Sequence, residues 1–193
     1  KKYGYDMAVL AGDKLFIYAF ETAAKAFALT DRADLVGKAI SILANKAGIY
    51  GMIGGQSVDV EYTDRPVTKS QLEFIYELKT AALLEAAMMI GAVLAGADDN
   101  QVKAAEQIAH HVGMAFQIRD DILDVISTTE ELGKPVKSDE KNNKTTYVTI
   151  YGLDGASKLV EEYSHTAMTL LDQVCPNASF LKRLFEYLIV RKK

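Results

Sequence analysis

The chain has 193 residues, of which 49% are hydrophobic and 25% are charged, and these proportions predict one soluble domain spanning residues 1–193. The net charge of −4 and the even spread of lysines give no basis for a nucleic-acid partner. The single cysteine excludes an intramolecular disulfide framework, and the absence of a long apolar run or a signal-peptide pattern predicts a cytoplasmic protein without integral membrane association.

Apolar residues recur at spacings of three and four along nearly the whole chain, which predicts an all-α fold. In chain order, the expected helices span residues 6–29, 33–50, 69–96, 100–126, 145–151, 157–173 and 177–191. Residues 72–94 are rich in Ala, Leu and Met on every side, so we expect this helix at the centre of a bundle. The polar stretch from Ser127 to Lys144 carries several Gly, Pro and Asn turn signals and is expected to be one long loop.

Three aspartates interrupt the apolar pattern near the end of the fourth expected helix. Asp120 and Asp124 are one helical turn apart on the same face, with Asp121 beside them. Their mutual repulsion favours a hard divalent counter-ion, and Mg²⁺ is usually held by one or two carboxylates together with substrate phosphates. The three residues are therefore candidate magnesium ligands, and the alternative is a solvated acidic patch.

Lysines provide the second candidate feature. Lys79, followed by Thr80, lies in the middle of the central apolar helix, where an unpaired ammonium is costly, so it is expected to face an anion or a cavity. Lys134 and Lys144 lie within and at the end of the expected loop. Together with a carboxylate-bound metal these groups would bind a diphosphate, although Lys134 and Lys144 taken singly also suit ordinary surface positions.

Two further patterns have more than one interpretation. His110-His111 with Glu106 is the nearest approach to a di-iron motif, but the spacing is four rather than three and no second copy exists, so satisfied core or surface histidines are favoured. Gly54-Gly55-Gln56, followed by Asp59, reads either as a loop or as a helix break where two backbones approach closely.

Taken together, these residues resemble the trans-isoprenyl (polyprenyl) diphosphate synthase family, most closely the bacterial farnesyl and geranylgeranyl diphosphate synthases. The matching motifs occur in family order: 7–13 (MAVLAGD), 54–56 (GGQ) with Asp59, Lys79-Thr80, 113–124 (GMAFQIRDDILD), and 132–135 (LGKP) followed by 144–147 (KTTY).

The resemblance implies an isoprenoid-synthase helical bundle around a central apolar cavity, and a prenyltransferase that joins isopentenyl diphosphate to an allylic diphosphate. It also implies the following roles: Asp120, Asp121 and Asp124 bind Mg²⁺; Lys79, Lys134 and Lys144 bind the allylic diphosphate; Thr80 and Gln117 lie beside the reacting carbons; Asp139 lies in the outer metal shell. Lys79, Thr80, Gln117 and Asp120 are thus the expected catalytic residues, and the expected product is a short-chain prenyl diphosphate.

The family's first aspartate-rich motif is expected before Lys1, so we interpret the chain as truncated at its N-terminus and expect it to be weakly active or inactive alone. Lost helices would expose core surface, which predicts an aggregation-prone chain. The resemblance also implies a homodimer.

Two alternatives to a catalytic prenyltransferase remain. A non-catalytic regulatory subunit of a heterodimeric synthase would have no need of the aspartates and lysines that this chain retains. A terpene cyclase shares the fold but uses a second metal motif of Asn, Ser/Thr and Glu, which is not found at the corresponding helix.

Overall fold

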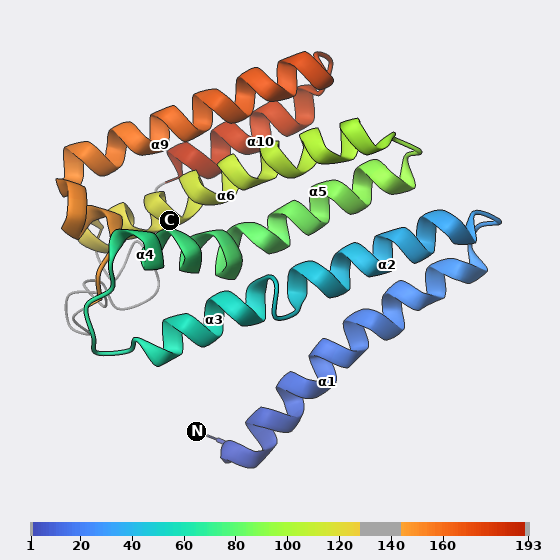
Figure 1. The fold of residues 1–193 in the computed structure, drawn as a ribbon, viewed down its shortest axis with the longest axis horizontal. Helices are drawn as coiled ribbons and strands as arrows, with labels where there is room; N and C mark the ends of the chain where they lie inside the picture. The colour runs from blue at the N-terminus through green and yellow to red at the C-terminus, as the bar shows by residue number, and fades with distance from the viewer. Residues whose placement is uncertain (1, 128–143, 192–193) are drawn as a thin grey trace.

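The computed structural model describes residues 2–127 and 144–191, and within these ranges it contains helices and connecting segments without a β-strand (Figure 1). The all-α prediction is confirmed. No helix in the described ranges has both the length and the hydropathy needed to cross a bilayer. In chain order the elements are α1 (Tyr5–Ala24), the 3₁₀ turn η1 (Lys25–Ala28), α2 (Ala33–Ala47), α3 (Met52–Glu61), α4 (Lys69–Tyr76), the π-helical segment η2 (Glu77–Ala81), α5 (Ala82–Leu94), α6 (Asp99–Ile126), α9 (Tyr147–Val174) and α10 (Ser179–Val190).

The helices pack as a bundle in which α5 and α6 are central. Helix α5 packs against α2 on one side and α6 on the other, and α6 packs in turn against α9 and α10. Two groups of buried apolar side chains fill the α6–α9 region, one around Met114 and Ile118 and the other around Ile108 and Leu171. The prediction that residues 72–94 lie at the centre of the bundle is confirmed.

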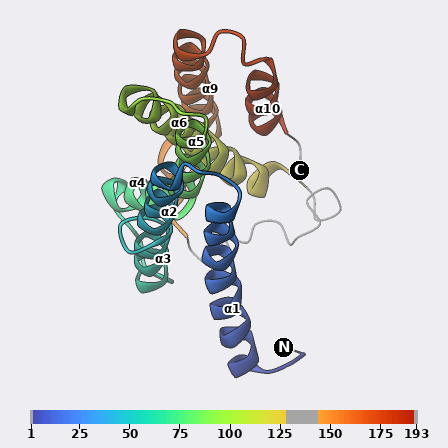
Figure 2. The same ribbon diagram turned by 90° about the vertical axis from the view of Figure 1, so that its right-hand side faces the viewer.

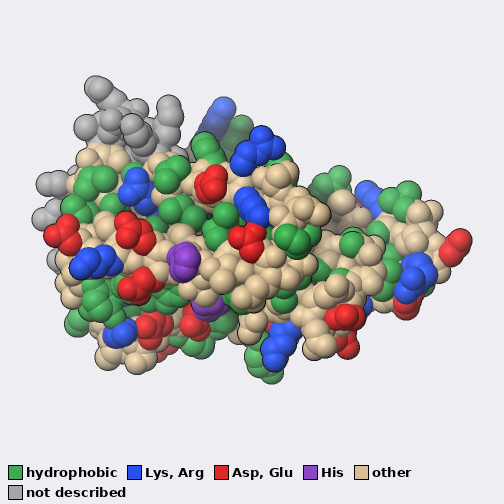
Figure 3. All heavy atoms as spheres, turned by 90° about the horizontal axis from the view of Figure 1, so that it is seen from above, with side chains coloured by type: hydrophobic (Ala, Val, Ile, Leu, Met, Phe, Trp, Pro, Cys, Tyr) green, Lys and Arg blue, Asp and Glu red, His purple; other side chains and the backbone are tan. Residues whose placement is uncertain are grey.

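Helix α1 differs from the others because none of its side chains is buried. It lies at the edge of the bundle next to α2, and Figure 2 shows it extending away from the remaining helices. Large apolar side chains such as Leu10, Leu15 and Ile17 are more than half exposed. On the face of the molecule shown in Figure 3, acidic and basic side chains are interspersed with hydrophobic ones.

Three helices begin with a reciprocal side-chain cap. Thr68 with Gln71 starts α4, Asp98 with Gln101 starts α6, and Thr146 with Thr149 starts α9. In each pair, both side chains accept hydrogen bonds from backbone N–H groups that would otherwise lack an intrahelical partner. Because each pair lies within four consecutive residues, the start of each of these helices is encoded locally in the sequence.

The structure corrects the expected loop at residues 54–56, because these residues lie inside helix α3. Glycine lowers helix propensity, but here the absence of a side chain at Gly55 permits a close backbone contact. The predicted close approach is confirmed, whereas the predicted helix break at these residues is wrong. The expected helices 145–151 and 157–173 are joined as α9, with a kink at Gly152, where φ is 71°. The expected loop from Ser127 to Lys144 falls almost entirely outside the described residues.

Candidate functional site

The site begins with the π-helical segment Glu77–Ala81, which two glycines allow to pack closely on both sides. A Cβ atom added at Gly55 of α3 would lie 2.4 Å from the backbone nitrogen of Lys79. A Cβ atom at Gly113 of α6 would lie 2.6 Å from the Cβ of Ala81. The segment is therefore held at backbone contact between α3 and α6, and it places Lys79 and Thr80 between them. Single π-helical turns of this kind are frequent at functional sites.

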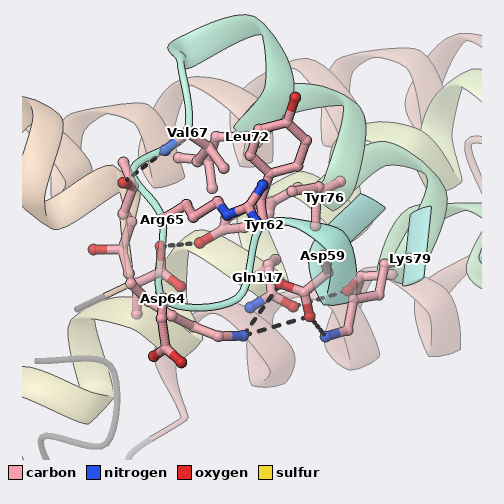
Figure 4. A pocket seen from close by; sticks show the side chains of 15 residues that line it. Asp59, Tyr62, Asp64, Arg65, Val67, Leu72, Tyr76, Lys79 and Gln117 are labelled. Carbon is pink, nitrogen blue, oxygen red and sulfur yellow. Dashed lines mark hydrogen bonds and ion pairs between the residues drawn. The ribbon is translucent and has the colours of Figure 1, made fainter. Parts of the chain in front are cut away.

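Lys79 and Lys144 meet at one carboxylate, that of Asp59 (Figure 4). Lys79 Nζ lies 2.6 Å from Asp59 Oδ2, and Lys144 Nζ lies 3.2 Å from Oδ1 and 3.4 Å from Oδ2. Burial raises the pKa of Asp59, but hydrogen bonds and attraction from Lys79 and then Lys144 outweigh burial and hold this pKa below its ordinary value. The prediction that Lys79 faces an anion is confirmed, and the anion is a carboxylate of the protein.

Thr80 and Gln117 form the next part of the site, on facing elements. The Thr80 hydroxyl donates to Oε1 of Gln117 at 2.8 Å, which links the π-helical segment to α6. Both side chains line the same cavity as Lys79 and Lys144. Because the hydrogen bond fixes the orientation of the amide, Gln117 presents its NH₂ group away from Thr80.

Asp121 connects three elements at the wall of this cavity. Its side chain is only 4% exposed, and Oδ2 accepts hydrogen bonds from the Tyr76 hydroxyl at 2.7 Å and from the backbone N–H of Tyr147 at 3.1 Å. The second bond satisfies a donor at the first residue of α9, where a negative charge is favoured by the helix dipole. Asp121 thereby holds the start of α9, and with it Lys144, close to α4 and α6.

The other two aspartates lie outside the set of residues lining this cavity. Asp120 Oδ1 accepts a hydrogen bond from the Arg191 guanidinium at 2.8 Å, and that guanidinium lies 3.7 Å from the ring centroid of Phe116. Arg119 donates in turn to the backbone carbonyl of Arg191 at 3.0 Å. Asp124 is buried, with 4% of its surface exposed. These contacts hold the end of α10 against the aspartate-bearing part of α6.

The cavity itself has a volume of about 100 Å³ and lies among α3, α4, the π-helical segment, α6 and the start of α9. Of the residues predicted from the sequence, the structure brings five together in its lining: Lys79, Thr80, Gln117, Asp121 and Lys144. Lys134 and Asp139, predicted for the diphosphate and the outer metal shell, lie outside the described residues.

The sequence analysis did not assign a role to Asp59, Tyr76 or Arg65, all of which line the cavity. One signal for Asp59 was present, because it follows Gly55 by one helical turn and therefore shares its face. Using that signal required knowing that residues 52–61 are helical.

Residues 1–177 match the family model described as polyprenyl synthetase. The chain belongs to the polyprenyl synthetase family. The farnesyl diphosphate synthase of Geobacillus stearothermophilus is 37% identical over 191 residues, covering 99% of this chain and 64% of that protein. The geranylgeranyl diphosphate synthase of Cyanophora paradoxa is 42% identical over 160 residues, covering 82% of this chain and 53% of that protein. The chain thus spans between about half and two thirds of the length of these relatives.

Among solved structures, a geranyltransferase from Helicobacter pylori complexed with magnesium and isoprenyl diphosphate has a TM-score of 0.82 with this polyprenyl synthetase chain, at 33% sequence identity. The match covers 97% of this chain and 61% of the other. The predicted family and its helical-bundle fold are confirmed.

The three aspartates predicted as metal ligands fit Mg²⁺ in their chemistry. Asp120, Asp121 and Asp124 offer only oxygen atoms, which Mg²⁺ prefers. Within the described residues, no group of three or more His, Cys, Asp or Glu side chains is placed to hold a metal ion on its own.

A second charged cluster lies on α2, α5 and α6. Lys46 Nζ lies 2.5 Å from both Glu85 Oε2 and Glu106 Oε1, and His110 Nδ1 lies 3.1 Å from Glu85 Oε1. Burial raises the pKa of Glu85, but hydrogen bonds from His110 and Lys46 lower it further than burial raises it. The hydrogen bond with Glu85 in turn raises the pKa of His110. Glu106 and His110 therefore each have an ionic partner within the protein. This supports the interpretation of His110 as a satisfied histidine rather than as part of a di-iron motif.

Proposed function

We propose that this chain is the diphosphate-binding part of a trans-prenyltransferase, which condenses isopentenyl diphosphate with an allylic diphosphate to give a short-chain prenyl diphosphate. The observation that carries the proposal is the cavity in which Lys79, Lys144, Asp59 and the Thr80–Gln117 pair converge from different parts of the chain. The two lysines share the Asp59 carboxylate and keep N–H donors that suit a polyanion. Over the cavity lining as a whole, Arg65 and the two lysines are matched in number by Asp59, Asp64 and Asp121. Membership of the polyprenyl synthetase family supports a diphosphate as that polyanion.

In the proposed reaction, the allylic C–O bond breaks and the diphosphate leaves with the electron pair. The double bond of isopentenyl diphosphate attacks the resulting carbocation, and a proton is then lost to the released diphosphate. Lys79 and Lys144 stabilise the negative charge that develops on the leaving group. Thr80 and Gln117 hold the reacting end of the allylic chain in place, and Lys134 and Asp139 are proposed for the outer diphosphate and metal positions.

We assign Asp120, Asp121 and Asp124 to hold Mg²⁺. When bound, the metal supplies additional positive charge for the leaving diphosphate. Asp121 is already anchored by Tyr76 and by the start of α9, so its carboxylate is oriented without the ion. Asp120 also pairs with Arg191. To hold the ion, Asp120 would either lose this ion pair or keep it through its other oxygen.

A cytoplasmic homodimer is the proposed assembly. Helix α1 supports it, since α1 presents Leu10, Leu15 and Ile17 to solvent and contributes no buried side chain to its own bundle. Several exposed large apolar side chains on one helix are a common feature of a protein interface.

The proposed function is tested by calorimetric titration of a non-hydrolysable allylic diphosphate analogue into the folded chain, with and without Mg²⁺. We expect binding that depends on Mg²⁺ and is lost in the Asp120→Ala variant. If the folded wild-type chain shows no Mg²⁺-dependent binding, the proposal is wrong and a non-catalytic subunit becomes the better assignment.

A further inference from the structure

Asp59 occupies a position that no role assigned so far explains. Its side chain is 17% exposed, whereas the side chains of Lys79 and Lys144 are each 36% exposed. Asp59 lines the same cavity as both lysines but is the least exposed of the three side chains. An ammonium has three N–H donors, so each lysine keeps donors for a ligand while it contacts Asp59.

The spacing of the two ammonium groups depends on this one carboxylate. Lys79 is in the π-helical segment and Lys144 precedes α9, and they are 20 and 85 residues from Asp59 in sequence. Both nitrogens contact Asp59 Oδ2, at 2.6 and 3.4 Å, so the two positive charges are no more than about 6 Å apart and repel each other. Without a shared anion, the lysines would move apart.

Helix packing places Asp59 at this point. Gly55 brings α3 into backbone contact with Lys79, and Asp59 is one turn further along the same face of α3. The lowered pKa of Asp59 agrees with a carboxylate that stays ionised between the two lysines.

We propose that Asp59 is a positioning residue, which holds Lys79 and Lys144 at the separation needed for both to bind the two phosphoryl groups of one diphosphate. This inference rests on the proposed function. The proposed role of Asp59 is exerted through the two lysines, whose ammonium groups bind the ligand. Its effect is on selectivity, because a single phosphate needs only one ammonium whereas a diphosphate uses both.

The test compares inorganic phosphate and inorganic diphosphate, titrated into the folded chain in magnesium buffer. The measured quantity is the Kd for phosphate divided by the Kd for diphosphate. Removing a negative charge strengthens the binding of both anions, and the ratio cancels most of that effect. In Asp59→Asn we expect the ratio to fall about tenfold, the size of effect typical of groups that share a partner.

The matched control is Glu61→Gln, which removes one negative charge from the exposed end of the same helix, two residues from Asp59. We expect this control to keep the wild-type ratio. Asp59→Glu preserves the charge but lengthens the side chain, so it is expected to lower the ratio as well, and it decides the question if Asp59→Asn fails to fold.

The outcomes separate the two proposals. Suppose that the wild-type chain binds diphosphate selectively and that the folded Asp59 variants have the same ratio of Kd values as Glu61→Gln. That result overturns the positioning role but leaves the proposed function standing. A folded wild-type chain that binds no diphosphate overturns both.

Discussion

The two charged clusters of this protein are built alike but differ in charge balance. In one, Asp59 pairs with two lysines; in the other, Lys46 pairs with Glu85 and Glu106, and His110 is a second partner for Glu85. Each cluster joins three separate parts of the chain. The central side chains are similarly buried, with Lys46 16% and Asp59 17% exposed, and the clearest difference in burial is at Glu85, which is 8% exposed.

The difference in charge leads us to propose that the Asp59 cluster binds a ligand and that the Glu85 cluster supports the fold. In the Glu85 cluster, positive and negative side chains are paired with one another within the protein. In the Asp59 cluster, two ammonium groups share one carboxylate and keep N–H donors for an anion. Matched substitutions should therefore separate binding from stability.

The largest expected effect is on stability, in Lys46→Met. This change leaves two carboxylates close together, one of them almost fully buried, so we expect the free energy of unfolding in urea to fall by about 3 kcal/mol. Diphosphate binding by the remaining folded protein should stay within about twofold of wild type, because the cluster does not line the cavity. A stable Lys46→Met variant would show that the buried cluster contributes little to the fold.

The same substitution at Lys79 should give the opposite pattern. In Lys79→Met, a charge-assisted contact with the ligand is lost, and we expect diphosphate to bind about 100-fold more weakly by calorimetry. The free energy of unfolding should change by less than about 1 kcal/mol, since the side chain is partly exposed and Asp59 keeps Lys144 as a partner. A large loss of stability with unchanged binding would reverse the assignment of the two clusters.

The smallest expected effect is a pH dependence of stability carried by His110. Its pKa in the folded protein is raised by Glu85, so its stabilising contribution is fully present below the unfolded value of about 6.5 and is lost as pH rises through the higher folded value. Glu77 adds attraction, whereas burial and Lys46 oppose it. The difference in unfolding free energy between wild type and His110→Gln should be about 1 kcal/mol larger at pH 6 than at pH 9. An equal difference at both pH values would mean that His110 is not charged in the folded state.

Local signals in the sequence predicted much of the fold. The last helix was expected at residues 177–191 and is observed at Ser179–Val190. The start of α6 is set by Asp98 and Gln101, which lie three residues apart. Such features depend on side chains that are neighbours along the chain, so they can be read without the tertiary structure.

The errors of the sequence analysis involve long-range contacts. Helix α3 was missed because Gly54 and Gly55 disfavour an isolated helix, and it is the contact of Gly55 with Lys79 that makes glycine suitable there. The π-helical turn that presents Lys79 and Thr80 was also missed, since apolar periodicity predicts an uninterrupted helix from 69 to 96.

By itself, the sequence determined the all-helical class and the family, because these follow from periodicity and from motifs in a fixed order. Only the tertiary structure decided how the charges are paired. Asp59 meets Lys144 across 85 residues and Asp120 meets Arg191 across 71. Electrostatic attraction acts through space at a few ångströms, so the partner of each charge is chosen by helix packing rather than by distance along the chain.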